Sequence, residues 1–72
     1  YTAGIYVVNT VTDYGMHVRD IPSKEDSKKI MDISNGTGVY ISEFSNGWGK
    51  VPYDGKPGWV QMSYLYLLRK DS

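Results

Sequence analysis

Closely spaced turn signals are the feature of this sequence that most restricts the fold it can adopt. Residues that favour tight turns gather at intervals along the chain: Asp13-Tyr14-Gly15, Asp20-Ile21-Pro22-Ser23, Asn35-Gly36, Ser45-Asn46-Gly47 and Tyr53-Asp54-Gly55. These intervals are close to those of an all-β domain. The Asn-Gly and Asp-Gly pairs also suit the positive backbone angles of tight hairpins. The chain is therefore expected to consist of short antiparallel strands joined by turns.

Between the turns lie short segments that are rich in β-branched and aromatic residues, which favour strands. The predicted strands cover residues 5–11, 16–19, 29–33, 39–44, 48–53 and 58–61. A single 3-10 turn is expected near residues 61–64, and the polar segment 24–30 is expected to be a loop. About five to seven short strands close most economically into a small barrel, since closure removes the sheet edges that invite aggregation.

The length and composition limit how a core can be built. The 72 residues are expected to form one domain over 1–72, near the size at which a single core is only just sufficient. No cysteine is present, which argues against a disulfide framework or a thiolate metal site. Aromatic and branched side chains must supply the core, and alternation predicts these members: Ile5, Val7, Met16, Val18, Ile30, Ile33, Val39, Ile41, Val51, Trp59, Val60 and Leu65.

The charge balance narrows the classes of partner. Eight acidic and eight basic side chains cancel, so no overall field attracts the chain to nucleic acid or to an anionic membrane surface. The basic cluster of Lys24, Lys28 and Lys29 is expected to be a solvated loop. No apolar run is long enough to cross a bilayer. Because the chain begins at Tyr1 without an initiator Met or a leader, we expect a piece of a longer protein.

The residue types needed for catalysis or metal binding form no recognisable group. His17 is the only histidine, and an imidazole without cysteine or a neighbouring carboxylate pair is typical of a structural or solvent-facing residue. Ser63 belongs to an unrelated motif and forms no triad with it. Several acidic residues lie in turns or in the polar loop, where they serve solvation and turn chemistry: Asp13, Asp20, Glu25 and Asp26. We expect neither an enzyme nor a metal or cofactor site.

An ordered series of segments resembles the bacterial SH3 (Src-homology-3) domain family over roughly residues 4 to 68. The segments are Met16-His17-Val18-Arg19 with Pro22-Ser23, Gly36-Thr37-Gly38-Val39-Tyr40-Ile41, Gly47-Trp48-Gly49-Lys50-Val51, and Gly55-Lys56-Pro57-Gly58-Trp59-Val60 with Tyr64-Leu65. His17 stands where the family usually has Asn, and Asp20-Ile21 replaces a pair of small residues. The resemblance implies an all-β fold, a small SH3-like barrel.

The function that the resemblance implies is that of a non-catalytic binding module. In this family such modules are commonly appended to secreted peptidoglycan hydrolases or other envelope proteins, which they are thought to hold on the cell wall. The implied partner is peptidoglycan or its peptide stem, and the implied location is extracellular or associated with the cell wall. A weak module suffices there because the tether raises its effective concentration near the polymer.

The resemblance also implies candidate ligand-binding residues. Trp48 and Tyr64 fall where eukaryotic relatives form a groove for extended peptides, and Gln61 falls where those relatives usually have a proline. Tyr14 would form a third wall if its turn folds over the groove. Aromatic grooves suit extended, low-entropy chains. Packing in the barrel is the other interpretation of Trp48 and Tyr64, and it is the expected role of Trp59.

Two other functions stay open. The chain is alternatively a protein-interaction module for an extended or proline-containing peptide, or a structural spacer that packs on a neighbouring catalytic domain. Arg19 has two alternatives as well. It either pairs with Asp20, Asp32 or Glu43, or it clamps a ligand carboxylate in a bidentate manner.

Overall fold

The computed structural model describes residues 1–10, 15–53 and 55–71 of the chain. These residues form eight strands and one 3-10 turn, η1. Their order is β1 (Gly4–Val8), β2 (Met16–Arg19), β3 (Lys29–Ile33), β4 (Gly38–Ile41), β5 (Phe44–Ser45), β6 (Trp48–Tyr53), β7 (Lys56–Gln61), η1 (Met62–Tyr64) and β8 (Leu65–Lys70). Tyr14, a predicted site residue, lies outside the described residues.

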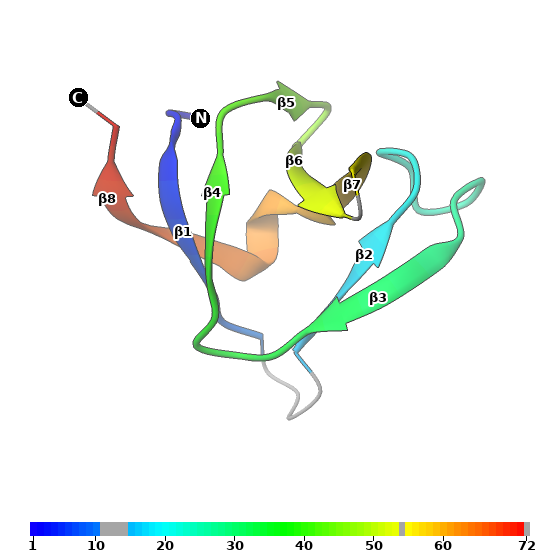
Figure 1. The fold of residues 1–72 in the computed structure, drawn as a ribbon, viewed down its shortest axis with the longest axis horizontal. Helices are drawn as coiled ribbons and strands as arrows, with labels where there is room; N and C mark the ends of the chain where they lie inside the picture. Colours follow the sequence, from blue (N-terminus) through cyan, green and yellow to red (C-terminus); the bar gives the residue numbers. More distant parts are fainter. Residues whose placement is uncertain (11–14, 54, 72) are drawn as a thin grey trace.

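Two antiparallel sheets make up the fold (Figure 1). One has the strand order β4-β1-β8 and the other β3-β2-β7-β6-β5. Segments far apart in the sequence lie side by side in them, so that β1 near the N-terminus pairs with both β4 and the C-terminal β8. The predicted all-β class is confirmed, and the arrangement is consistent with a small SH3-like barrel.

Most of the predicted elements are confirmed. β2, β3 and β6 begin and end where the sequence predicts, and η1 supplies the expected 3-10 turn. Residues 24–28 of the segment expected to be a loop form neither helix nor strand, but its last two residues, Lys29 and Ile30, belong to β3. The predicted strand 39–44 is divided into β4 and β5. β8 is absent from the predicted strands, because a short apolar run without alternation is followed there by polar residues. Antiparallel pairing with β1 extends this strand to Lys70.

The core lies between the two sheets and takes side chains from both. Its buried cluster consists of Tyr6, Val8, Met16, Val18, Ile33, Ile41, Val51, Val60 and Met62. Gly49 lets β6 approach the other sheet closely, since a Cβ at this position would lie 2.6 Å from Sδ of Met62 and 2.8 Å from Cγ2 of Ile41. Packing at such close range makes the two sheets parts of one core.

The predicted orientation of β1 is wrong. Ile5 is 36% exposed whereas Tyr6 is 4% exposed, and the core cluster contains Tyr6 and Val8 rather than Ile5 and Val7. Val7 is buried, but outside that cluster. The segment from Ile5 to Val8 contains no charged residue, so polar alternation does not indicate which face points inward.

The predicted place of Trp59 in the core is also wrong. Gly58 and Val60 are buried on the inner face of β7, and Trp59 between them is half-buried. Side chains alternate along a strand, so Trp59 lies on the outer face, opposite Arg19 of β2 and Lys50 of β6. Gly58 also approaches Val18 closely, and a Cβ on it would lie 2.5 Å from Cγ1 of that valine. The inner face at this point therefore has no room for an indole ring.

Candidate functional site

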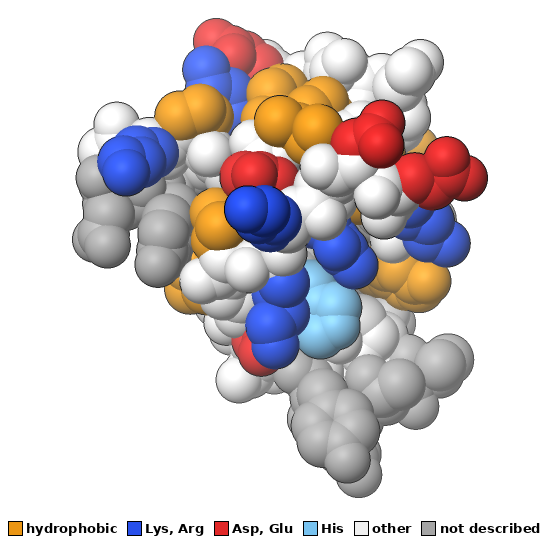
Figure 2. All heavy atoms as spheres, turned by 90° about the vertical axis from the view of Figure 1, so that its right-hand side faces the viewer, with side chains coloured by type: hydrophobic (Ala, Val, Ile, Leu, Met, Phe, Trp, Pro, Cys, Tyr) orange, Lys and Arg blue, Asp and Glu red, His pale blue; other side chains and the backbone are white. Residues whose placement is uncertain are grey.

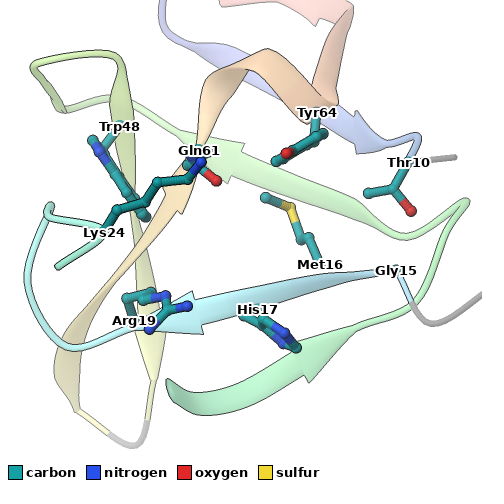
Figure 3. Close-up of a pocket in the computed structure, with 9 residues that line it drawn as sticks. All are labelled: Thr10, Gly15, Met16, His17, Arg19, Lys24, Trp48, Gln61 and Tyr64. Atoms are coloured by element: carbon teal, nitrogen blue, oxygen red, sulfur yellow. The ribbon is translucent and has the colours of Figure 1, made fainter. Parts of the chain in front are cut away.

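An open pocket lies beside β2 and the 3-10 turn (Figure 3). Its volume is about 320 Å³. We call it the Trp48–Tyr64 pocket, and its lining consists of Thr10, Gly15, Met16, His17, Arg19, Lys24, Trp48, Gln61 and Tyr64. Segments from both halves of the chain therefore meet at one surface depression.

The pocket brings together the described residues that the sequence predicts to bind ligand. Trp48 and Gln61 stand directly opposite each other in the β6–β7 ladder, and Tyr64 ends the 3-10 turn that follows β7. Trp48 is 7% exposed but belongs to the pocket wall and not to the core cluster, and Tyr64 is 40% exposed. Trp48 thus forms a packed wall, while Tyr64 offers an accessible aromatic face.

Backbone hydrogen bonds hold the two aromatic residues in place. The amide of Met62, the first residue of η1, donates to the carbonyl of Gly47 over 2.9 Å, which ties the 3-10 turn to the residue before Trp48. The amide of Asn9 donates to the carbonyl of Tyr64 over 2.9 Å, which ties the other end of the turn to the chain beyond β1. Gly47 has a positive φ of 82° and follows Asn46 at 52°, as the tight hairpin turn between β5 and β6 requires. The relative position of Trp48 and Tyr64 is therefore set by backbone contacts.

One side of the pocket is basic. Arg19 and Lys24 line it, the first half-buried and the second exposed, and no Asp or Glu is among the lining residues that the structure describes. Lys24 comes from the polar loop, and sequence analysis missed it as a site residue because the charged run Lys24-Glu25-Asp26 is typical of a solvated loop. In Figure 3 the side chain of Lys24 extends toward Gln61. The pocket therefore combines aromatic walls, one amide and two positive charges.

Arg19 makes none of the ion pairs that the sequence left open for it. Asp20 accepts a hydrogen bond from the backbone amide of Lys28 at 2.8 Å, Asp32 contacts His17 and Lys29, and Glu43 pairs with Lys50 at 2.9 Å. Within the described part of the chain, no carboxylate pairs with the Arg19 guanidinium. Its contact is a single hydrogen bond from Nη1 to the carbonyl of Ser27, at 3.4 Å.

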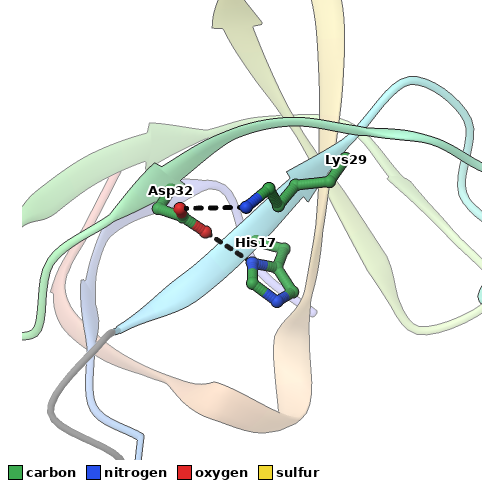
Figure 4. Close-up of polar contacts among 3 residues, drawn as sticks. All are labelled: His17, Lys29 and Asp32. Carbon is green, nitrogen blue, oxygen red and sulfur yellow. Dashed lines mark hydrogen bonds and ion pairs between the residues drawn. The ribbon is translucent and has the colours of Figure 1, made fainter.

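His17 is held by a carboxylate that sequence analysis did not assign to it. The β2–β3 register places Asp32 directly opposite, and Nδ1 of His17 contacts Oδ1 of Asp32, while Nζ of Lys29 lies 3.4 Å from Oδ2 (Figure 4). The hydrogen bond with His17 is the main reason why the pKa of Asp32 is below its usual value of 3.8. Figure 2 shows Lys and Arg side chains beside the histidine on this side of the molecule. The contact with Asp32 agrees with the expectation that His17 is a structural or solvent-facing residue.

A second, larger hollow of about 590 Å³ lies along β3 and β4. Apolar side chains such as Met31, Val39 and Pro52 form much of its lining, and Asp32 is the only charged residue among the lining residues described. Because Asp32 is already engaged by His17 and Lys29, the described part of this hollow offers a ligand no unpaired charge. None of the three predicted ligand-binding residues that the structure describes lines it. The Trp48–Tyr64 pocket is therefore the stronger candidate site.

The described residues lack two other features. They contain no group of three or more His, Cys, Asp or Glu side chains that could hold a metal ion. Among the same residues, no helix has the length and apolar character needed to cross a membrane. Comparison with known protein families, curated proteins and solved structures found no match.

Proposed function

We propose that this chain is a non-catalytic module that binds cell-wall peptidoglycan by seating its peptide stem in the Trp48–Tyr64 pocket. The observation that carries the proposal is the meeting of Trp48, Gln61 and Tyr64 in one open pocket. An exposed aromatic face beside an amide suits an extended peptide, because the ring covers apolar backbone and side-chain surface while the amide both donates and accepts hydrogen bonds. The resemblance to the bacterial SH3 family supports the cell wall as the source of that peptide.

Binding is proposed in preference to catalysis because of how the Thr10 hydroxyl and the His17 imidazole, which both line the pocket, are engaged. Thr10, His17 and Asp32 are the residue types of an acyl-transfer triad, in which the hydroxyl must reach the imidazole. Oγ1 of Thr10 instead donates to Oδ1 of Asn35 at 3.0 Å. The His17 side chain is directed to Asp32 at the edge of the sheet. This arrangement supports holding a ligand without transforming it.

Co-sedimentation with purified peptidoglycan sacculi tests the proposal. The folded chain should sediment with sacculi, and Tyr64→Ala should weaken the apparent affinity about tenfold, as expected for an exposed aromatic anchor. Tyr66→Ala is the matched control, because Tyr66 is 49% exposed on β8 and does not line the pocket. The proposal fails if the folded wild type stays in the supernatant, or if the two tyrosine variants lose affinity equally.

The outer face of the β4-β1-β8 sheet favours a second candidate function, packing against a neighbouring domain. Four apolar side chains of this sheet are exposed to solvent. Their exposed fractions are 36% for Ile5 on β1, 51% for Tyr40 on β4, and 49% and 62% for Tyr66 and Leu68 on β8. Contiguous exposed apolar side chains are typical of interaction surfaces. In a longer protein that contains this chain, Leu68→Asp should then expose the domain junction to limited proteolysis, whereas Tyr64→Ala should not.

A further inference from the structure

We infer that the ligand of the Trp48–Tyr64 pocket carries a carboxylate, and that the guanidinium of Arg19 binds this group with support from Lys24. The inference rests on the proposed function, because it names the chemical class that the same site selects. The carboxylate to which we assign this role is that of the peptide stem. The assignment follows from the partners of Asp20, Asp32 and Glu43, the three acids that the sequence offered to Arg19.

Every acidic side chain that the sequence offered to Arg19 is engaged elsewhere. Asp20 binds a backbone amide of its own loop, Asp32 is held by two basic residues, and Glu43 pairs with Lys50. The guanidinium has five N–H donors in a planar fork, and its hydrogen bond is a 3.4 Å contact with one backbone carbonyl. Among the described residues, Arg19 therefore keeps most of its donor capacity for a group outside the protein.

The surroundings strengthen the preference for an anion. Arg19 is half-buried, so it is less hydrated than a fully exposed arginine, and a charge in such a place gains more from an opposite charge than it would in bulk water. Lys24 lines the same pocket, and the described residues of that lining include no Asp or Glu. Among the lining residues that the structure describes, a carboxylate bound here would meet two positive charges and no negative one. Charge-assisted hydrogen bonds of this kind are roughly twice as strong as neutral ones.

The geometry also fixes how the rest of the peptide would lie. Arg19 and Tyr64 stand on opposite sides of the pocket, with Gln61 and Met16 between them (Figure 3). A peptide whose carboxylate contacts Arg19 would therefore cross the Gln61 amide and reach the aromatic face of Tyr64. In this arrangement Arg19 would bind the carboxylate, the side-chain amide of Gln61 would contact the backbone of the peptide, and the ring of Tyr64 would contact its apolar surface.

Neutralising the carboxylates of the ligand tests the inference without altering the protein. Sacculi whose carboxyl groups have been converted to amides with a carbodiimide and ammonia should bind the wild-type chain about tenfold more weakly than untreated sacculi. Arg19→Gln should show a similar loss on untreated sacculi and little further loss on amidated ones, because both changes remove the same interaction. Arg19→Lys should recover part of the affinity, since it keeps the charge but not the fork.

Arg69→Gln is the matched control. It removes the same guanidinium from the exposed face of β8, outside the pocket, and should leave binding unchanged. Equal binding of native and amidated sacculi by the wild type overturns the inference while the proposed function stands. Binding to neither form removes the proposed function.

In that last case, nuclear magnetic resonance titration with N-acetyl-trialanine and with its C-terminal amide decides the inference alone. Shifts of the Arg19 side-chain signals with the acid but not with the amide support it. Equal shifts, or none, overturn it. Thermal unfolding of each arginine variant shows whether a binding loss accompanies a loss of folded structure, and the amidation experiment does not depend on either variant.

Discussion

At the scale of single residues, two basic side chains on the same strand differ in whether they contact a carboxylate. His17 faces Asp32 across the β2–β3 ladder and is held there, whereas Arg19, two residues later, meets no carboxylate among the described residues. The sequence alone left both residues open, because pairing depends on register and not on spacing along the chain. Asp32 therefore contacts its neighbours His17 and Lys29, whereas Arg19 lines the pocket.

The charge of Asp32 makes a pH-dependent contribution to stability. Its pKa in the folded protein is below the usual 3.8, chiefly because of the hydrogen bond with His17. A carboxyl group with a lowered folded-state pKa adds stability that is present above its unfolded pKa and is lost as the pH falls through its folded pKa. We expect Asp32→Asn to lower the thermal unfolding midpoint at pH 7, with a difference that shrinks below pH ~3.8.

Thermal unfolding followed by circular dichroism from pH 2 to pH 7 measures this difference. A gap between wild type and Asp32→Asn that is the same at both ends of the range would contradict the electrostatic origin. A titration midpoint of the Asp32 carboxyl signal at or above 3.8 would contradict the direction of the pKa shift itself.

The two tryptophans show how a residue's role is decided by its place on a strand. Trp48 and Trp59 both follow glycine-containing turns, and sequence analysis expected Trp59 inside the barrel. Trp59 instead lies on the outer face between basic residues of β2 and β6, whereas Trp48 is the more buried ring and forms a pocket wall. Gly58 and Val60 take the inner positions of β7, where Val18 packs closely.

At the scale of elements, the orientation of β1 decides which of its side chains enter the core. Its inner face carries Tyr6 and Val8, and Ile5 points away from the core cluster. The register between β1 and β8 also shifts between Ile5 and Tyr6. No alternation of polar and apolar residues in this segment could have indicated either feature.

A pair of substitutions in β1 tests the corrected orientation. Val8→Asp should unfold the domain at pH 7, because Val8 is 0% exposed and burying an unpaired carboxylate costs several kcal/mol, comparable with the roughly 5–15 kcal/mol that stabilises a domain. Ile5→Asp places the same group at a 36% exposed position. It should leave the domain folded, at a cost of about 1 kcal/mol.

Dispersion of the amide signals in a heteronuclear correlation spectrum distinguishes the two outcomes. Collapse of the spectrum for Ile5→Asp, with a dispersed spectrum for Val8→Asp, would mean that the faces of β1 are assigned the wrong way round.

At the scale of the whole molecule, the two sheets depend on a shared core. Ile41 and Val8 come from the β4-β1-β8 sheet, and Val18, Val51 and Val60 come from the other. Since neither sheet has a separate buried cluster among the described residues, both should unfold in one cooperative step, as small domains usually do.

Ile41→Val tests this cooperativity. Ile41 is fully buried in β4, and removing one buried methylene should cost about 0.5–1.5 kcal/mol, which lowers the unfolding midpoint by about 4–8 °C per kcal/mol in a domain of this size. Both tryptophans lie in the other sheet, on β6 and β7. The tryptophan fluorescence transition should therefore move by the same amount as the far-ultraviolet circular dichroism transition. Two transitions that shift by different amounts would show that the sheets unfold separately.

The sequence by itself determined the local features of this protein. Turn residues and β-branched segments placed most of the strands, the polar loop and the 3-10 turn, because backbone preferences act over a few neighbouring residues. The motif order also indicated Trp48, Gln61 and Tyr64 as a group. Tertiary structure decided which faces point inward, that β8 pairs with β1, that Asp32 holds His17, and that Lys24 and Arg19 join the pocket. These outcomes depend on strand register and on contacts between distant segments, which local residue preferences do not encode.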